Sequence, residues 1–180
     1  MNEKCLRNFF YQVFNYDINN LTCEIKKLPF NNLQDIMIFI GVFEDENGKR
    51  QLVVPKIMDI KSFLVNVHEY THEIICEKTL ENINYDDDYS EVIAVTMERF
   101  YVTKYYQNYL SELNVSQLKK LEYYMTNPNY FYRYILAYYY QFILIDKYYQ
   151  NISKILEYPF ENNTYDLNVI GFKTLQLLKK

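Results

Sequence analysis

Residues 59–78 read DIKSFLVNVHEYTHEIICEK, and this stretch decides the fold. A single stripe of residues recurs at intervals of three or four positions, which is typical of one face of an amphipathic helix. The stripe consists of Phe63, Leu64, Val67, Thr71, Ile74 and Ile75. Asp59 can cap the first turn. We therefore predict a helix from Asp59 to about Lys78.

This helix contains the pentad His68-Glu69-Tyr70-Thr71-His72, an H-E-x-x-H pattern that includes both histidines of the chain. The i, i+4 spacing places the two imidazoles on one helical face, where they can bind one zinc ion. Glu69 lies between them and can reach a metal-bound water, whose pKa zinc lowers to about 7. We expect a Zn²⁺ site with Glu69 as general base. The alternative is two unrelated surface histidines.

A catalytic zinc needs a third protein ligand and an open fourth position. With no histidine left, the third ligand must be a carboxylate or a cysteine, and Glu91 in the next predicted helix is the leading candidate. Ala94 is small enough to let two helices approach closely, and Glu98 is placed to orient a ligand histidine. Asp88 and Glu91 also fit a helix-capping pair that needs no metal. We expect Asp86, Asp87 and Asp88 to form a solvated loop and cap.

The N-terminal part predicts a helix over residues 2–16 and short strands over residues 21–28, 36–43 and 50–54. Asn47-Gly48 predicts a type I′ hairpin turn between the last two strands. The strand over residues 36–43 is apolar on both faces, so helices should cover part of the sheet. We expect Glu73 and Glu77 on the exposed side of the pentad helix, and residues 50–54 at an open sheet edge that could accept an extended peptide.

From Asp59 onward the pattern is helical, and a polar stretch over residues 81–88 interrupts it. Helices are predicted over residues 89–110, 116–126 and 130–150, with a further helix from Leu167. The tail from Tyr158 could join the helical core or occupy a substrate cleft. The fold class is α+β: a small antiparallel sheet of about three strands packed against a mainly helical bundle, in one domain over residues 1–180.

Composition excludes several function classes. The chain has 180 residues and a net charge of −4, which disfavours a nucleic-acid partner. Its longest apolar run, residues 36–43, is far too short to span a membrane, and the N-terminus lacks the apolar region of a secretory signal. Three scattered cysteines give no disulfide framework. We expect a cytoplasmic protein without a membrane partner; its oligomeric state is open.

The pentad followed by Glu91 resembles the gluzincin class of zinc metallopeptidases. Residues 88–98, DYSEVIAVTME, resemble the glutamate helix of the thimet oligopeptidase and oligoendopeptidase F family, in which a small residue and a second glutamate follow the ligand. The length is that of a minimal, single-domain version of this catalytic core. The resemblance implies a peptidase that acts on a peptide or unfolded segment, with His68, His72 and Glu91 as zinc ligands and Glu69 as base. It also implies an oxyanion-binding tyrosine on a late helix, for which Tyr134 is the best match.

Two alternatives stay open. Metallopeptidases of phages and stress regulation that cleave a repressor share the pentad and a later Glu-x-x-Ala, which Glu91 and Ala94 satisfy, but their Ala-Asn-x-Phe-Ala continuation is absent here. The other alternative is a non-catalytic, Tyr-rich helical interaction module, consistent with 21 tyrosines, that holds at most a structural zinc.

Overall fold

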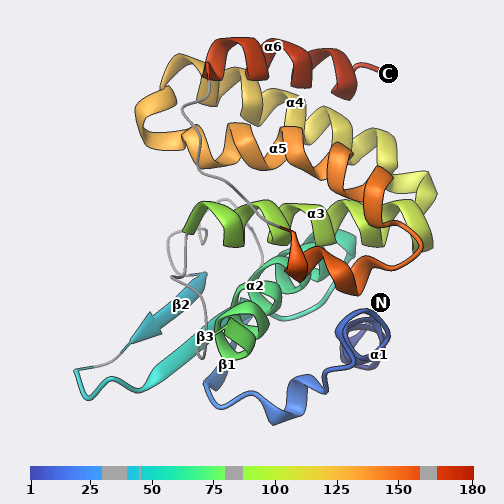
Figure 1. Ribbon diagram of the computed structural model, residues 1–180. Coiled ribbons are helices and arrows are strands. Elements are labelled where there is room, and N and C mark those ends of the chain that lie inside the picture. Colours follow the sequence, from blue (N-terminus) through green and yellow to red (C-terminus); the bar gives the residue numbers. More distant parts are fainter. Residues whose placement is uncertain (30–39, 45, 80–86, 159–165) are drawn as a thin grey trace. The chain divides into compact units, whose positions relative to one another are not determined.

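The computed structural model describes residues 1–29, 40–44, 46–79, 87–158 and 166–180 (Figure 1). The chain forms two compact units, Met1–Asn84 and Tyr85–Lys180. The first unit contains a three-stranded sheet with helices, and the described part of the second is helical. The predicted α+β class is confirmed, whereas one domain over residues 1–180 stays a prediction.

The first unit is built around a mixed sheet. Its elements are α1 (Glu3–Phe14), a short 3₁₀ helix (Ile18–Asn20), β1 (Glu24–Leu28), β2 (Gly41–Glu44), β3 (Arg50–Pro55) and α2 (Ile60–Thr79). The strand order is β1-β3-β2. β3 pairs antiparallel with β2 but parallel with β1, so the prediction of an antiparallel sheet was wrong for the second pairing. The hairpin inserts its second strand between β1 and β2, and this also corrects the prediction that residues 50–54 form an edge.

The predicted β2–β3 hairpin is present, but its turn differs from the expectation. Glu44 pairs with Arg50, so the connection is five residues long rather than two. Gly48 has a φ of 74°, whereas Asn47 is not among the described residues with positive φ. A type I′ turn requires positive φ at both positions, so this turn type is excluded. Residues 36–39 of the predicted strand lie outside the described residues.

Helix α2 packs against β3 and also contacts β2 and α1. Its predicted cap is present: Asp59 Oδ1 accepts a hydrogen bond from the Ser62 amide at 2.8 Å. The buried face follows the predicted stripe, with Phe63, Val67, Thr71 and Ile74 fully buried. The sheet and α1 therefore hold α2 by its apolar face, as the helical periodicity indicated.

The carboxylates of Glu73 and Glu77 are turned inward, which corrects the prediction that both are exposed. Glu73 has no exposed surface, and Arg50 Nη2 of β3 lies 2.7 Å from its Oε2. Glu77 accepts hydrogen bonds from the Tyr16 hydroxyl and from the Thr22 amide and hydroxyl, the last two at 2.7 Å. Periodicity marked this face as polar but could not show that donors from β3 and the segment after α1 cover it.

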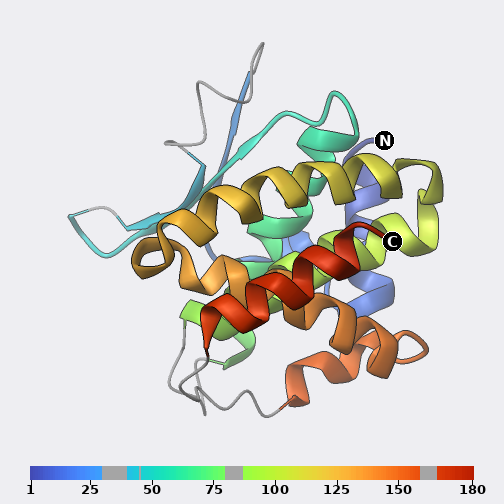
Figure 2. The same ribbon diagram turned by 90° about the horizontal axis from the view of Figure 1, so that it is seen from above.

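The second unit is a helical stack with α5 at its centre (Figures 1 and 2). Its elements are α3 (Asp87–Tyr105), a 3₁₀ turn (Gln107–Tyr109), α4 (Leu110–Thr126), α5 (Pro128–Tyr148), a 3₁₀ helix (Ile152–Glu157) and α6 (Leu167–Leu178). Helix α5 packs against α3, α4 and α6. Figure 2 shows α6 lying over α4 and α5, so the tail helix belongs to the core of this unit. Gly171 permits the close approach, since a Cβ there would lie 2.8 Å from Met125 Sδ.

A buried arginine links three helices of this stack. Arg99 of α3 is 5% exposed and donates hydrogen bonds to Gln141 of α5 at 2.7 Å and to Asn114 and Gln117 of α4 at 2.6 and 2.9 Å. Burial lowers the pKa of Arg99 to about 10. The guanidinium remains charged at neutral pH and is solvated by amide oxygens of the neighbouring helices.

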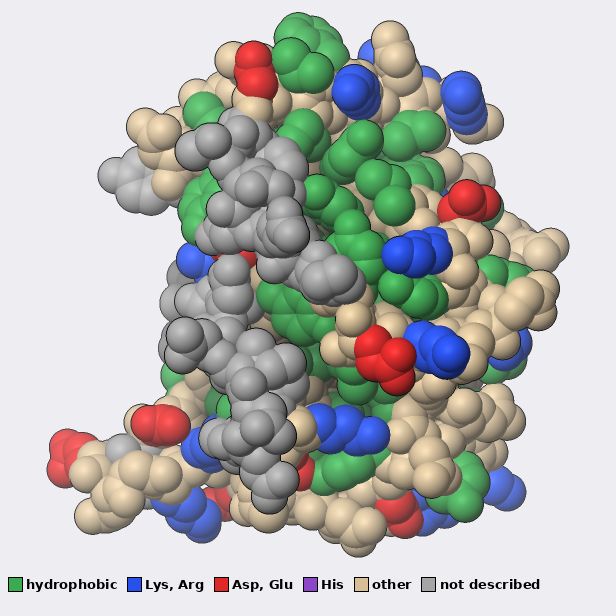
Figure 3. All heavy atoms as spheres, viewed as in Figure 1, with side chains coloured by type: hydrophobic (Ala, Val, Ile, Leu, Met, Phe, Trp, Pro, Cys, Tyr) green, Lys and Arg blue, Asp and Glu red, His purple; other side chains and the backbone are tan. Residues whose placement is uncertain are grey.

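The face in Figure 3 carries acidic and basic side chains interspersed with apolar ones, and no histidine side chain is visible on it. Within the described part of the chain, no helix combines the length and apolar character that crossing a bilayer requires.

We predict that Arg50→Met lowers the free energy of unfolding by about 3 kcal/mol, because it leaves the buried Glu73 carboxylate without its cation. Urea unfolding followed by circular dichroism measures this. The control is Lys49→Met, which removes an exposed pair with Glu24 and should cost less than about 1 kcal/mol. The double variant Arg50→Met/Glu73→Leu should recover most of the loss. If Arg50→Met and Lys49→Met lowered the free energy of unfolding by the same amount, the stabilising role of the Arg50–Glu73 pair would be contradicted.

Candidate metal centre

The two imidazoles of α2 converge as the pentad predicts. One helical turn separates His68 from His72, and their Nε2 atoms lie 3.0 Å apart, with the ring centroids at 4.7 Å. Two nitrogens bound to one tetrahedral zinc at ordinary bond lengths are about 3.3 Å apart. A shift of a few tenths of an ångström therefore suffices for both nitrogens to bind a single ion.

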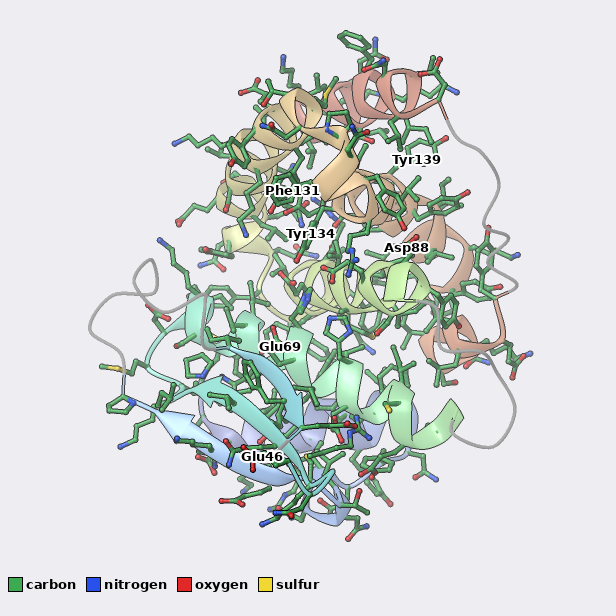
Figure 4. The ribbon with its side chains drawn as sticks, turned by 90° about the vertical axis from the view of Figure 1, so that its left-hand side faces the viewer. Glu46, Glu69, Asp88, Phe131, Tyr134 and Tyr139 are labelled. Atoms are coloured by element: carbon green, nitrogen blue, oxygen red, sulfur yellow. The ribbon has the colours of Figure 1, made fainter. Side chains whose placement is uncertain are left out.

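Glu69 follows His68 directly in the same helix, α2 (Figure 4). His68, Glu69 and His72 are half-buried, whereas Tyr70 and Thr71 between them are buried. The Thr71 hydroxyl donates to the Val67 carbonyl at 2.6 Å and so remains within its own helix. The polar face of the pentad therefore consists of the three side chains that the chemistry requires.

Glu91 lies in the second turn of α3 and is 5% exposed. The residues that follow it, Val92, Ile93 and Ala94, are fully buried, so this carboxylate lies in an apolar section of the helix. Burial of a carboxylate costs free energy unless hydrogen bonds, cations or a metal compensate. A buried glutamate here therefore suits a metal ligand better than an exposed capping residue.

Among the described residues, His68, His72 and Glu91 form a group that could hold a metal ion, with ligand atoms all within 4.8 Å of one another. Glu98, which the sequence suggested as a residue that orients a ligand histidine, is outside this group. Two imidazoles and one carboxylate are a donor set typical of catalytic zinc with an open position. The residues present thus fit the predicted ion.

Asp88 departs from the expected solvated loop. It lies in the first turn of α3, is 2% exposed, and its Oδ1 is 3.9 Å from Arg133 Nε of α5. The neighbouring Tyr89 donates hydrogen bonds to the carbonyls of Ile155 and Leu156 at 3.2 and 3.0 Å. The start of α3 is therefore fixed by contacts within the second unit. Asp86 lies outside the described residues.

Aromatic side chains of α4 and α5 form a stack that includes Tyr134. Its ring lies 5.0 Å from that of Tyr124, which also stacks on Phe131 at 4.8 Å and Tyr138 at 6.2 Å. Figure 4 shows Phe131 and Tyr134 near one another in this unit. Tyr134 is half-buried, whereas Tyr138 is 4% exposed. Tyr134 is therefore the more accessible residue of the two.

Sequence reasoning missed that Tyr124 and Tyr138 lie close to the glutamate helix. Burial raises the pKa of both phenols, and the negative charge of Glu91 raises it further. The negative charge of Glu98 also raises the pKa of the Tyr138 phenol. No sequence signal distinguished these two from the other tyrosines, because their position depends on how α4 and α5 pack beside α3.

Comparisons with protein-family models, with curated proteins and with solved structures returned no match to this chain.

We predict that Glu91→Gln weakens zinc affinity by at least about 100-fold, since it removes the charge of the expected third ligand. Glu98→Gln should weaken it by less than that, as expected for a residue that only orients a ligand. Competition titration against a chromophoric chelator measures both affinities, and circular dichroism checks that each variant is folded. A larger loss in Glu98→Gln than in Glu91→Gln would transfer the ligand assignment to Glu98.

Proposed function

We propose that this protein is a zinc-dependent peptidase. The observation that carries the proposal is the group of His68, His72 and Glu91, with Glu69 inside the same helical turn. The donor set leaves one coordination position for water or substrate, as catalytic zinc sites do.

In this proposal, zinc supplies a Lewis acid that polarises the scissile carbonyl and makes water nucleophilic near neutral pH. Glu69 accepts the proton of the attacking water and then transfers it to the departing amide nitrogen. Its half-buried position suits both steps, because the carboxylate can be reached by substrate yet is only partly solvated. His68 and His72 act as fixed ligands, held by the buried face of α2.

Tyr134 is the proposed donor to the oxyanion that develops on the carbonyl oxygen. A phenol donates a hydrogen bond without adding negative charge. Its partial exposure and its stacking on Tyr124 favour it over the buried Tyr138, since an oxyanion donor must be both ordered and reachable.

The proposed substrate is an extended peptide or unfolded segment. Among the described strands, β1 and β2 lie at the sheet edges. Of these two edge strands, β2 makes the more extensive contact with α2. The outer edge of β2 is therefore a better position for an added strand than β3, which is central. Main-chain hydrogen bonds there would hold the backbone extended beside the pentad helix.

A non-catalytic module with a structural zinc is the second reading, and the donor set argues against it. Structural zinc sites favour four protein ligands, usually with several thiolates. Within the described residues the candidate group has three ligands and no cysteine.

We predict that Glu69→Gln binds one zinc with affinity close to that of the original chain but loses peptidase activity by at least about 100-fold. Activity is measured on a quenched fluorescent peptide library, and zinc by elemental analysis. The control is Glu122→Gln, an exposed position on α4 that should leave activity unchanged. Equal activity of the Glu69 and Glu122 variants would refute the role of Glu69.

We also predict that Tyr134→Phe lowers kcat by about 10²- to 10³-fold and leaves zinc content unchanged, because one oxyanion donor is lost. Tyr123→Phe is the matched control, since Tyr123 is exposed on α4. If Tyr124→Phe lowers kcat while Tyr134→Phe does not, the donor is Tyr124.

A further inference from the structure

The first unit contains a cavity of about 250 Å³ that the proposed peptidase chemistry does not use. It is lined by residues of α1, the 3₁₀ helix that follows, β1, the end of β3 and α2, together with Ile57. Its apolar wall consists of Leu6, Ile18, Ile25, Pro55 and Ile57. This wall can remove a short hydrocarbon chain from water, which favours binding of an apolar tail.

Basic side chains surround this apolar wall. Lys4, Arg7 and Lys27 line the cavity, and an adjoining shallow hollow shares Lys4 and Lys27 and adds Lys56. The acidic side chain in both linings is Glu3, whose carboxylate lies 2.7 Å from Lys27 Nζ. Four cations and one carboxylate therefore gather here, on a chain whose net charge is −4. Such a concentration of positive charge favours an anion.

Two residues of α2 complete the lining. Asn66 is 2% exposed, and its Nδ2 donates to the carbonyls of Pro55 and Ser62 at 2.9 and 2.8 Å, so its two N–H donors are engaged. Tyr70 is 3% exposed and packs against Phe10 of α1, with ring centroids 6.1 Å apart.

We propose that this cavity binds a small anionic amphiphile: a carboxylate with an unbranched apolar tail of medium length. The tail lies against Leu6, Ile25 and Ile57, and the carboxylate lies among Lys4, Lys27 and Lys56. The volume of about 250 Å³ is slightly below that of pockets that hold drug-sized molecules, which suits one short chain. The proposal does not rest on metal binding or on peptidase activity.

A molecule bound in this cavity would contact α2, the helix that carries His68 and His72, on its buried side. Tyr70 lies in the same turn as His68 and His72, while its ring points toward α1. Because the ligand would contact α1, β1 and α2 together, it stabilises the first unit by binding its folded form.

The test uses octanoate as the probe, titrated into the full chain by isothermal calorimetry. We expect one saturable site with a Kd below about 1 mM. Octylamine, with the same tail and the opposite charge, and butyrate, with a shorter tail, should each bind at least tenfold more weakly. Equal binding of octanoate and octylamine, or no saturable binding of octanoate, overturns the proposal.

Two variants locate the site. Lys4→Gln/Lys56→Gln should weaken octanoate binding at least fivefold, and Ile57→Trp, which fills the mouth from a half-exposed position, should abolish it. The matched control is Lys119→Gln/Lys120→Gln, a pair of exposed lysines on α4. Circular dichroism and the melting temperature identify variants that fail to fold, and Lys4→Gln alone then replaces the double variant. Unchanged octanoate affinity in the folded Lys4 variants overturns the assignment.

Discussion

The convergence of two imidazoles on one face of α2 is the constraint on which the proposed chemistry depends. A helix of 3.6 residues per turn brings His68 and His72 together only if α2 remains regular through residues 68–72. The surrounding contacts maintain this regularity. Asp59 caps its start, the fully buried residues of its apolar face pack on β3, and Glu73 and Glu77 are held by Arg50, Tyr16 and Thr22. The structure thus fixes the helix from three sides and leaves the pentad face accessible.

The proposed metal site also explains why a carboxylate lies in the buried part of α3. Glu91 is surrounded in sequence by fully buried residues, and its negative charge raises the pKa of Tyr124 and Tyr138 in the same unit. A buried negative charge beside phenols is costly unless a cation compensates. Zinc binding at the proposed site would therefore contribute to the stability of the folded chain.

Much of this arrangement could be predicted from the sequence because its signals are local. The period of residues 59–78 predicted α2 to within one residue at each end, and α6 begins at Leu167 as predicted. The pentad predicted the position of the two histidines, since i, i+4 spacing is a property of the helix alone.

The features that were missed depend on partners distant in sequence. Strand alternation does not encode pairing direction, so the parallel β1–β3 pair could not be distinguished. Likewise, the inward turn of Glu73 depends on Arg50, 23 residues earlier. Tyr124 becomes a neighbour of Glu91 only through the packing of α4 and α5.

The most direct test of the central claim is X-ray absorption spectroscopy at the zinc edge on the full chain loaded with one equivalent of zinc. The account predicts two imidazole nitrogens and a carboxylate oxygen at about 2.0–2.2 Å, together with a further light-atom ligand in the open position. The imidazole signal should halve in His72→Ala. A spectrum with sulfur ligands at about 2.3 Å, or one that His72→Ala leaves unchanged, would contradict the site and the function built on it.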